Sequence, residues 1–232
     1  MNVHEEPQKS VAKPAERSSL GDNEIIPDAA QLLVATVGAL LIGVLYLVLP
    51  GQLTVGPNWL LLVIEVVLLA VPIISAFFIR RLLPHRLARG LALGLLVVVT
   101  AALVGSLVLL INNLSFFHQG GLLLRPAALL WGINVLVFAV WYWEIDGGGR
   151  VSRHQAGHQA ADFQFPQQIG GNTSGWAPGF IDYLFLAFCS ATALSPADTM
   201  PLTRRAKLLM MIEALISLLI VILLVARAVN IG

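Results

Sequence analysis

The chain has 232 residues, of which 57% are hydrophobic and 12% are charged, and its mean hydropathy is +0.83. Soluble domains carry about a quarter charged residues, so this composition excludes an ordinary soluble protein. The formal net charge of +1 provides no basic surface for nucleic acid, and the single cysteine, Cys189, excludes an internal disulfide and a cysteine-based metal cluster. We expect a protein of the lipid bilayer with no cofactor, no metal and no nucleic-acid partner.

Residues 1–28 form a polar tail with several prolines, so this tail is expected to be disordered and contains no signal-peptide core. Apolar runs of about 17–24 residues follow, and an apolar helix of roughly 20 residues crosses the ~30 Å hydrocarbon core of a bilayer. The five runs cover residues 29–49, 58–79, 90–111, 127–143 and 206–229. The sequence therefore predicts an all-α, polytopic transmembrane helix bundle, with its first four helices within residues 29–145.

The loops between the runs indicate the orientation. The loop after the second run contains Arg80, Arg81, Arg86 and Arg89, and loops rich in Lys and Arg stay on the cytoplasmic side of the membrane. The same rule places the N-terminal tail in the cytoplasm. It also places residues 146–179, a polar loop rich in Gly, Gln and His, on that side.

Residues 180–195 are apolar, but a helix of about 16 residues spans only ~24 Å. Two interpretations are open: a thin sixth span, or a re-entrant half-helix that returns to its own side. Re-entry keeps Arg204, Arg205 and Lys207 in the cytoplasm, whereas a sixth span places them outside. The charges therefore favour five spans plus a re-entrant C-terminal half-helix, with residues 180–232 forming the half-helix and the last transmembrane helix.

The layout from Gly179 onward resembles the pore module of two-transmembrane potassium channels. The matching positions are Asp182, Tyr183, Phe185, Phe188, Thr192, Asp198, Pro201 and Glu213. The resemblance implies a pore loop. Leu194, Ser195 and Pro196 stand where a potassium filter has glycines, however, so potassium selectivity is not implied.

Two further elements, WYWE-x-DGGG at residues 141–149 and SPxDTMPL at residues 195–202, occur in the chain. With these elements the chain resembles a family of uncharacterised bacterial multi-pass membrane proteins. The resemblance implies a location in the bacterial inner (cell) membrane and supplies no activity.

Two carboxylates lie inside predicted spans. Glu65 is in the second run and Glu213 is in the last run, and a carboxylate in a span costs ~2–3 kcal/mol or more, which makes each a candidate for function. Each serves either as an ion relay or as a hydrogen-bonded contact between helices. They lie at similar depths from opposite faces of the membrane, so they are not expected to form a pair.

The pore-loop segment adds Thr192, Ser195 and Asp198 as candidates for an ion or solute path. Asp198 has three possible roles: it caps the last helix, lines a pore mouth, or pairs with Arg204. Capping is the simplest of the three.

The end of the fourth run carries Glu144 and Asp146, followed by three glycines. Two carboxylates beside a freely turning backbone form a possible cation or headgroup site; the alternative is a helix end with a flexible turn.

Other polar and small residues are weaker candidates. His154 and His158 are four residues apart, a spacing that suits one helix face and a metal, although HExxH is absent. Gly90 and Gly94 form a GxxxG element that indicates close packing within or between subunits, and mid-span Asn134 is expected to join helices.

The leading functional hypothesis is an ion or small-solute channel or sensor with a degenerate pore loop. It is expected to be a homo-oligomer, because one pore loop cannot enclose a filter. The alternative is a non-transporting membrane scaffold or assembly partner. A membrane-embedded enzyme that acts at the Glu144–Asp198 face is third, since no GxSxG, Walker or dinucleotide motif is present.

Overall fold

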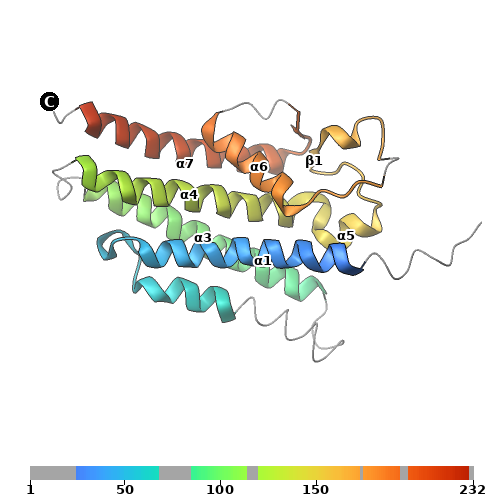
Figure 1. Cartoon of the computed structure of the whole chain (residues 1–232), viewed down its shortest axis with the longest axis horizontal. Helices are drawn as coiled ribbons and strands as arrows, with labels where there is room; N and C mark the ends of the chain where they lie inside the picture. The colour runs from blue at the N-terminus through green and yellow to red at the C-terminus, as the bar shows by residue number, and fades with distance from the viewer. Residues whose placement is uncertain (1–24, 68–84, 114–119, 173–174, 194–197, 230–232) are drawn as a thin grey trace, which may run out of the picture.

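The computed structural model describes residues 25–67, 85–113, 120–172, 175–193 and 198–229. Most of these residues are helical, and the long helices lie side by side in one bundle (Figure 1). The long helices are α1 (Ile25–Val48), α3 (His85–Asn112), α4 (Gly120–Ile145) and α7 (Arg204–Val229). A further helix begins at Asn58 and is described as far as Val67, after the short η1 (Gly51–Leu53).

Three of the described helices are long and apolar enough to cross a membrane. They cover Arg89–Asn112, Leu123–Gly148 and Arg204–Ala226, where the third, fourth and last spans were predicted. Shorter apolar helices cover Leu33–Val48 and Asn58–Val67. The remainder of the predicted second span, with Pro72, Arg80 and Arg81, lies outside the described residues.

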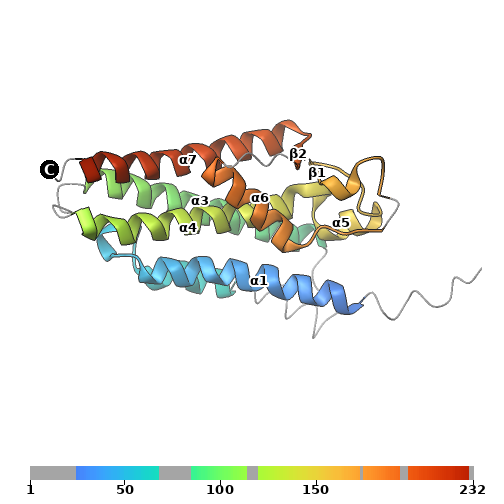
Figure 2. The ribbon, with the colours of Figure 1, turned by 45° about the horizontal axis from the view of Figure 1, so that its top comes forward.

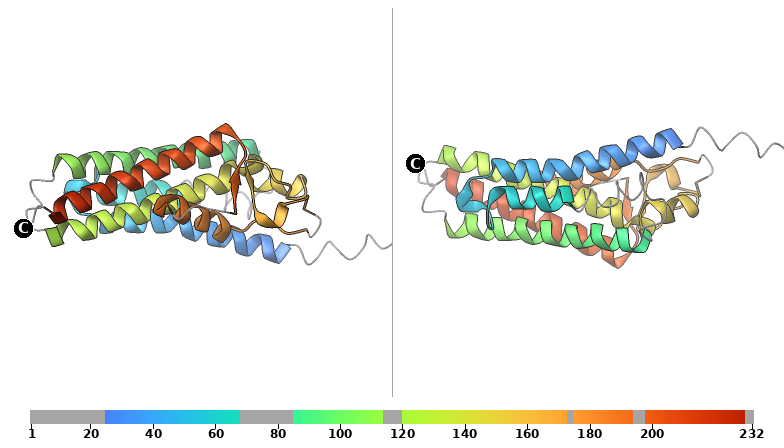
Figure 3. Two further views of the ribbon diagram at one scale, coloured as in Figure 1. Left: turned by 90° about the horizontal axis from the view of Figure 1, so that it is seen from above. Right: turned by 90° about the horizontal axis from the view of Figure 1, so that it is seen from below.

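Helix α4 is the central helix of the bundle. It packs against α1, α3, α6 (Phe180–Thr192) and α7. Helices α6 and α7 cover one side of α4, while α1 and the helix that begins at Asn58 lie on the opposite side (Figures 2 and 3). A helix that is apolar around its whole circumference is typically buried, and α4 accordingly supplies much of the core: Leu130, Ile133, Val137, Phe138, Ala139 and Tyr142.

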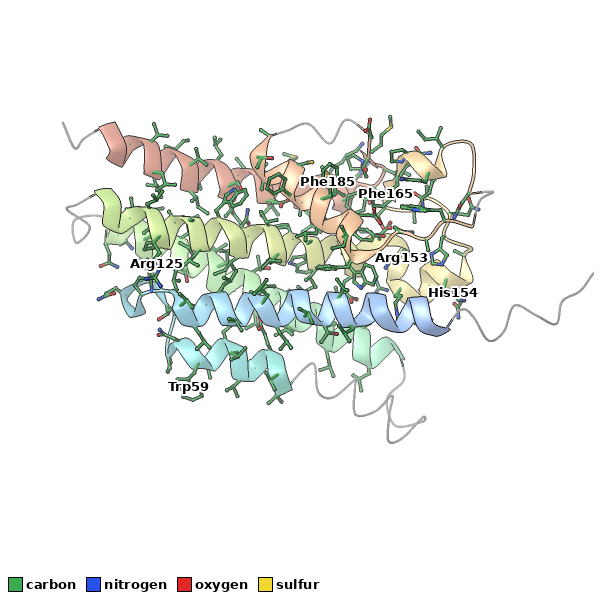
Figure 4. The ribbon with its side chains drawn as sticks, in the orientation of Figure 1. Trp59, Arg125, Arg153, His154, Phe165 and Phe185 are labelled. Carbon is green, nitrogen blue, oxygen red and sulfur yellow. The ribbon has the colours of Figure 1, made fainter. Side chains whose placement is uncertain are left out.

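The start of α4 differs from the sequence-based expectation. The fourth apolar run was predicted to begin at residue 127, with a loop through Arg125 before it, whereas α4 already begins at Gly120 and contains Pro126. A proline is tolerated near a helix N-terminus, where the N–H groups have few partners inside the helix. Arg125 is exposed at the end of the bundle opposite α5 (Arg150–Gln155; Figure 4).

Helices α6 and α7 begin at the same end of the bundle. The ring of Phe180 lies 6.0 Å from Trp143 of α4, whereas Phe188 lies 5.8 Å from Trp131. Helix α6 therefore runs alongside α4 in the opposite direction for 13 residues, or ~20 Å, and ends near the middle of α4. Helix α7 then starts back at the end where α6 started (Figure 1).

Residues 146–179, called the cap segment below, close that end of the bundle. They contain η3 (Asp146–Gly148), α5, β1 (Phe163–Gln164) and η4 (Pro166–Gln168). Strand β1 pairs antiparallel with β2 (Met200–Pro201), which directly precedes α7. Backbone hydrogen bonds therefore join the cap segment to the short strand that precedes α7.

The contact between α1 and the helix that begins at Asn58 depends on Gly43. A Cβ at this position would lie 2.3 Å from Oε2 of Glu65 and 3.1 Å from Cα of Leu62. We expect Gly43→Ala to lower the free energy of unfolding by about 1–3 kcal/mol, because the backbone of Leu62 must move. Thermal unfolding of the detergent-solubilised protein measures this loss.

Gly90→Ala is the matched control for that substitution. No described atom lies within 4 Å of a Cβ at Gly90 or Gly94, so close packing at this GxxxG element is not found among the described residues. Alanine at position 90 is expected to leave stability unchanged or to raise it by up to about 1 kcal/mol, since alanine is the better helix former. Equal losses in the two variants would contradict the close approach at Gly43.

Candidate functional site

Asp146 anchors the cap segment to the helices. Its side chain is 2% exposed, and Oδ1 accepts hydrogen bonds from the backbone N–H groups of Asp162 (2.9 Å) and Phe163 (3.2 Å). Oδ2 accepts the hydroxyl of Tyr183 from α6 at 2.6 Å. Gly147 continues the chain with φ of 55°, a backbone conformation that favours glycine. The carboxylate of Asp146 thus joins the end of α4, β1 and α6.

Asp162 continues this network to α7. Its carboxylate is buried and accepts the hydroxyl of Thr203 (2.6 Å), the N–H of Gly147 (3.0 Å), and both Nε and Nη2 of Arg205 (2.5 Å each). Burial alone raises the pKa of this carboxyl. The hydrogen bonds from Arg205 and Thr203 outweigh that effect, so the pKa lies below its ordinary value. The carboxylate is therefore ionised at neutral pH and holds the start of α7.

Arg153 supports the same end of the bundle from α5. Its side chain is 3% exposed, and Nη1 donates hydrogen bonds to the carbonyl groups of Trp143 (2.6 Å) and Asp146 (2.8 Å). Its guanidinium carbon lies 4.9 Å from the Trp143 ring and 5.4 Å from the Tyr183 ring. These are cation–π distances, and Figure 4 shows Arg153 at the cap end of the bundle.

The carboxylates of Glu144 and Asp146 interact with different groups. Glu144 is half-buried and interacts electrostatically with Arg89, Arg150 and Arg153. Asp146 binds backbone amides and a tyrosine hydroxyl instead. Both carboxylates of the predicted cation or headgroup site therefore interact with groups of their own chain.

A second polar cluster lies inside the bundle, between α4 and α7. The hydroxyl of Tyr142 donates to Oε2 of Glu213, and the amide of Asn134 donates to Oγ of Ser217 (2.9 Å) and to the carbonyl of Glu213 (3.3 Å). All four of these side chains are buried, and Ser190 of α6 lies beside the Tyr142–Glu213 pair. We call this set of five residues the polar seam.

Two acceptors of the polar seam lack a donor. Oε1 of Glu213 and Oδ1 of Asn134 are buried and have no hydrogen-bond partner among the described residues. Buried polar atoms are rarely left without a partner in native proteins. The polar seam therefore contains two buried acceptors that the described contacts leave without a donor.

Glu65 lies apart from the polar seam. Its carboxyl is buried against Gly43 of α1, and Oε2 has no hydrogen-bond partner among the described residues. Glu213, in contrast, contacts α4. The two carboxylates thus have separate sets of neighbours.

The three predicted pore-loop residues differ in their surroundings. The hydroxyl of Thr192 donates to the carbonyl of Phe188 inside α6 (2.7 Å), and Ser195 lies outside the described residues. Asp198 is exposed. The capping interpretation of Asp198 is wrong, because α7 begins at Arg204 and the hydroxyl of Thr203 accepts the N–H of Ala206 at 3.3 Å.

The histidine pair does not share a helix. Helix α5 ends at Gln155, and His158 has a positive φ of 53°. The expectation of one helix face is therefore wrong, although the two rings lie 5.6 Å apart. The described part of the chain contains no group of three or more His, Cys, Asp or Glu residues that could hold a metal ion.

Asp162, Arg153 and Thr203 were not identified from the sequence. The available signal was the alternation of Phe163, Gln164 and Phe165 inside a polar loop, which is typical of a short strand with one buried face. Phe163 and Phe165 are indeed buried. Comparison with family models, with curated proteins and with solved structures found no match to the chain.

Proposed function

We propose that this chain is one subunit of a homo-oligomeric ion or small-solute channel or sensor, in which α6 re-enters the membrane from the cytoplasmic side. The observation that carries this proposal is the common starting point of α6 and α7. Tyr183 near the start of α6 binds Asp146, and Thr203 before α7 binds Asp162, whose N–H binds Asp146. A sixth full span would separate these two starting points by the thickness of the bilayer.

Length supports re-entry. The 13 residues of α6 extend ~20 Å, which is shorter than the ~30 Å hydrocarbon core. With α6 as a half-helix, five helices cross: α1, the helix that begins at Asn58, α3, α4 and α7. This number of spans is the same as the number predicted from the apolar runs.

Charge supports a cytoplasmic cap. Arg89, Arg150, Arg153 and Arg205 all belong to the cap end of the bundle. Loops rich in Arg and Lys favour the cytoplasmic side. Helix α1 begins at the same end (Figure 1), so this orientation places the start of α1 on the cytoplasmic side. The bacterial inner membrane is the location that we propose from the sequence resemblance.

The end of α6 favours an oligomer. Ala193 has a left-handed φ of 56° and ends the helix at the depth of mid-α4. Irregular backbone at membrane depth is tolerated only where protein or water surrounds it. The outer face of α6 is exposed at Ile181, Phe185 and Phe188, and further copies of the chain, arranged around a shared axis, would cover both features.

Cysteine accessibility tests the re-entrant topology. In a Cys189→Ser background, single cysteines replace Ser152 in the cap, Arg204 at the start of α7, and Trp59 at the other end; all three residues are exposed. Intact cells are treated with an impermeant thiol reagent before and after permeabilisation. We expect the cysteine at position 59 to react at once and those at positions 152 and 204 to react only after permeabilisation. Reaction at position 204 in intact cells would establish a sixth span.

Flux into proteoliposomes tests the activity. The wild-type protein is compared with Thr192→Ala and Asp198→Asn for H⁺, Na⁺ and K⁺. Vesicles that are indistinguishable from empty ones for all ions would exclude a channel.

A scaffold is the second candidate, and one observation favours it. Both oxygens of Asp146 and of Asp162 accept hydrogen bonds from their own chain, as expected where carboxylates only hold the fold. A scaffold predicts that a tagged chain co-purifies with a fixed partner and conducts nothing.

A further inference from the structure

We propose that the carboxyl of Glu213 is a proton-binding site in the interface of α4, α6 and α7. The proton is then the ion that the proposed channel or sensor responds to, and this second statement rests on the proposed function. The binding site itself is argued from the contacts of the polar seam.

Neutral groups surround the Glu213 carboxyl. Tyr142 of α4 donates to Oε2, and Ser190 of α6 also hydrogen-bonds to the carboxyl. Oε1 is buried and has no further partner among the described residues. Tyr142 is the titratable group among these contacts, and no charged side chain of the described residues acts on the carboxyl beside it. The nearest strong ion pair on α7 is at Arg205, eight residues or ~12 Å along the helix, and Asp162 engages it.

The donor count favours a proton over a metal ion. An ionised carboxylate is an acceptor only, whereas a protonated carboxyl also donates one hydrogen bond. The polar seam has two acceptors without a donor, Oε1 of Glu213 and Oδ1 of Asn134. One added proton supplies a donor at this place and removes a charge from the bilayer interior, where an uncompensated charge costs at least ~2.5–3.5 kcal/mol. Calcium or magnesium needs about six oxygen ligands, which the described polar seam does not provide.

The surroundings indicate access from the cap end. Beyond Asn134 and Ser217, the contact between α4 and α7 continues with Leu130 and Ile220, both fully buried and apolar. Toward the cap, the side chain of Arg205 is exposed, whereas the Asp162 carboxylate that it binds is buried. We take this end, which the orientation above places in the cytoplasm, as the side from which the proton enters.

Infrared difference spectroscopy tests this site directly. Wild-type protein and Glu213→Gln are reconstituted in nanodiscs at neutral pH, and the carbonyl stretching band of a protonated carboxylic acid is recorded in H₂O and D₂O. We expect a band in the wild type that Glu213→Gln lacks. Tyr142→Phe removes only the hydroxyl donor, so it is expected to shift the frequency of this band while preserving it. Glu65→Gln is the control, because its carboxyl is similarly buried but has other neighbours, and it leaves the Glu213 band in place.

The outcomes separate this inference from the proposed function. Identical carboxylic-acid bands in the wild type and Glu213→Gln would overturn the proton site. If Glu213→Gln does not fold, an unshifted band in Tyr142→Phe would overturn it instead. A band that behaves as expected in protein that conducts no ion supports the site and rejects the channel. Ion flux without the band supports the channel and rejects the site.

Discussion

Replacement of Asp146 by asparagine is expected to release the cap segment and to lower the free energy of unfolding by about 3 kcal/mol. The carboxylate accepts three hydrogen bonds through its two oxygens, from the amides of Asp162 and Phe163 and from the hydroxyl of Tyr183. Asparagine has one acceptor oxygen, and its NH₂ group cannot accept the remaining bonds. At least one buried donor therefore loses its partner.

Two measurements check this result. Thermal unfolding in detergent reports the loss of stability, and limited trypsin digestion reports access to Arg153, whose side chain is buried in the intact protein. Asp198→Asn is the control, because Asp198 is an exposed aspartate. Equal unfolding temperatures for Asp146→Asn and the wild type would contradict the anchoring role.

Replacement of Arg205 by alanine is also expected to destabilise the cap end of the bundle. It leaves the buried carboxylate of Asp162 without its bidentate partner, although Thr203 and Gly147 remain bound to it. The Arg205 side chain is 56% exposed, and water offsets part of the loss, so we expect about 1–2 kcal/mol. A double-mutant cycle with Asp162→Asn isolates this interaction, and Arg204→Ala is the control. Additive losses in the cycle would contradict the ion pair.

The pH dependence of stability follows from the same carboxylate. The pKa of Asp162 is lower in the folded protein than in the unfolded chain, so the folded state binds fewer protons in the acid range. The stabilisation is fully present above the unfolded pKa of about 3.9 and is lost as pH falls through the folded pKa. In Asp162→Asn this acid-dependent loss of stability is expected to be smaller. Above the unfolded pKa, the free energy of unfolding of the variant is expected to be lower than that of the wild type by a constant amount.

The membrane helices could be predicted because their signal is local. A run such as residues 90–111 is apolar at almost every position, and its length alone matches a bilayer. The polarity of residues 146–179 also indicated a segment outside the bundle, but the burial of Phe163 in it depends on β2, more than thirty residues later. The alternation around Phe163 indicates a short strand, but nothing in it identifies β2 as the strand with which it pairs.

The partner of Glu213 and the cap of α7 could not be predicted from the sequence for a related reason. Glu213 was recognised as unusual in an apolar helix, yet its contact with Tyr142 depends on how α7 is rotated against α4, and both helices are apolar around most of their circumference. Asp198 was preferred as the helix cap because aspartate is a good cap. The chain instead uses Thr203, since Asp162 fixes the hydroxyl of that residue at the helix start.

The network around Asp162 also imposes an order on biogenesis. Its partners Thr203 and Arg205 follow α6 in the chain, whereas Asp146 and Asp162 precede it. During synthesis α6 is therefore made before the residues that complete its attachment exist. A nascent chain that stops before α7 therefore has α6 in contact with α4 but not yet with α7, and α6 gains its full set of neighbours only when the last helix has been made.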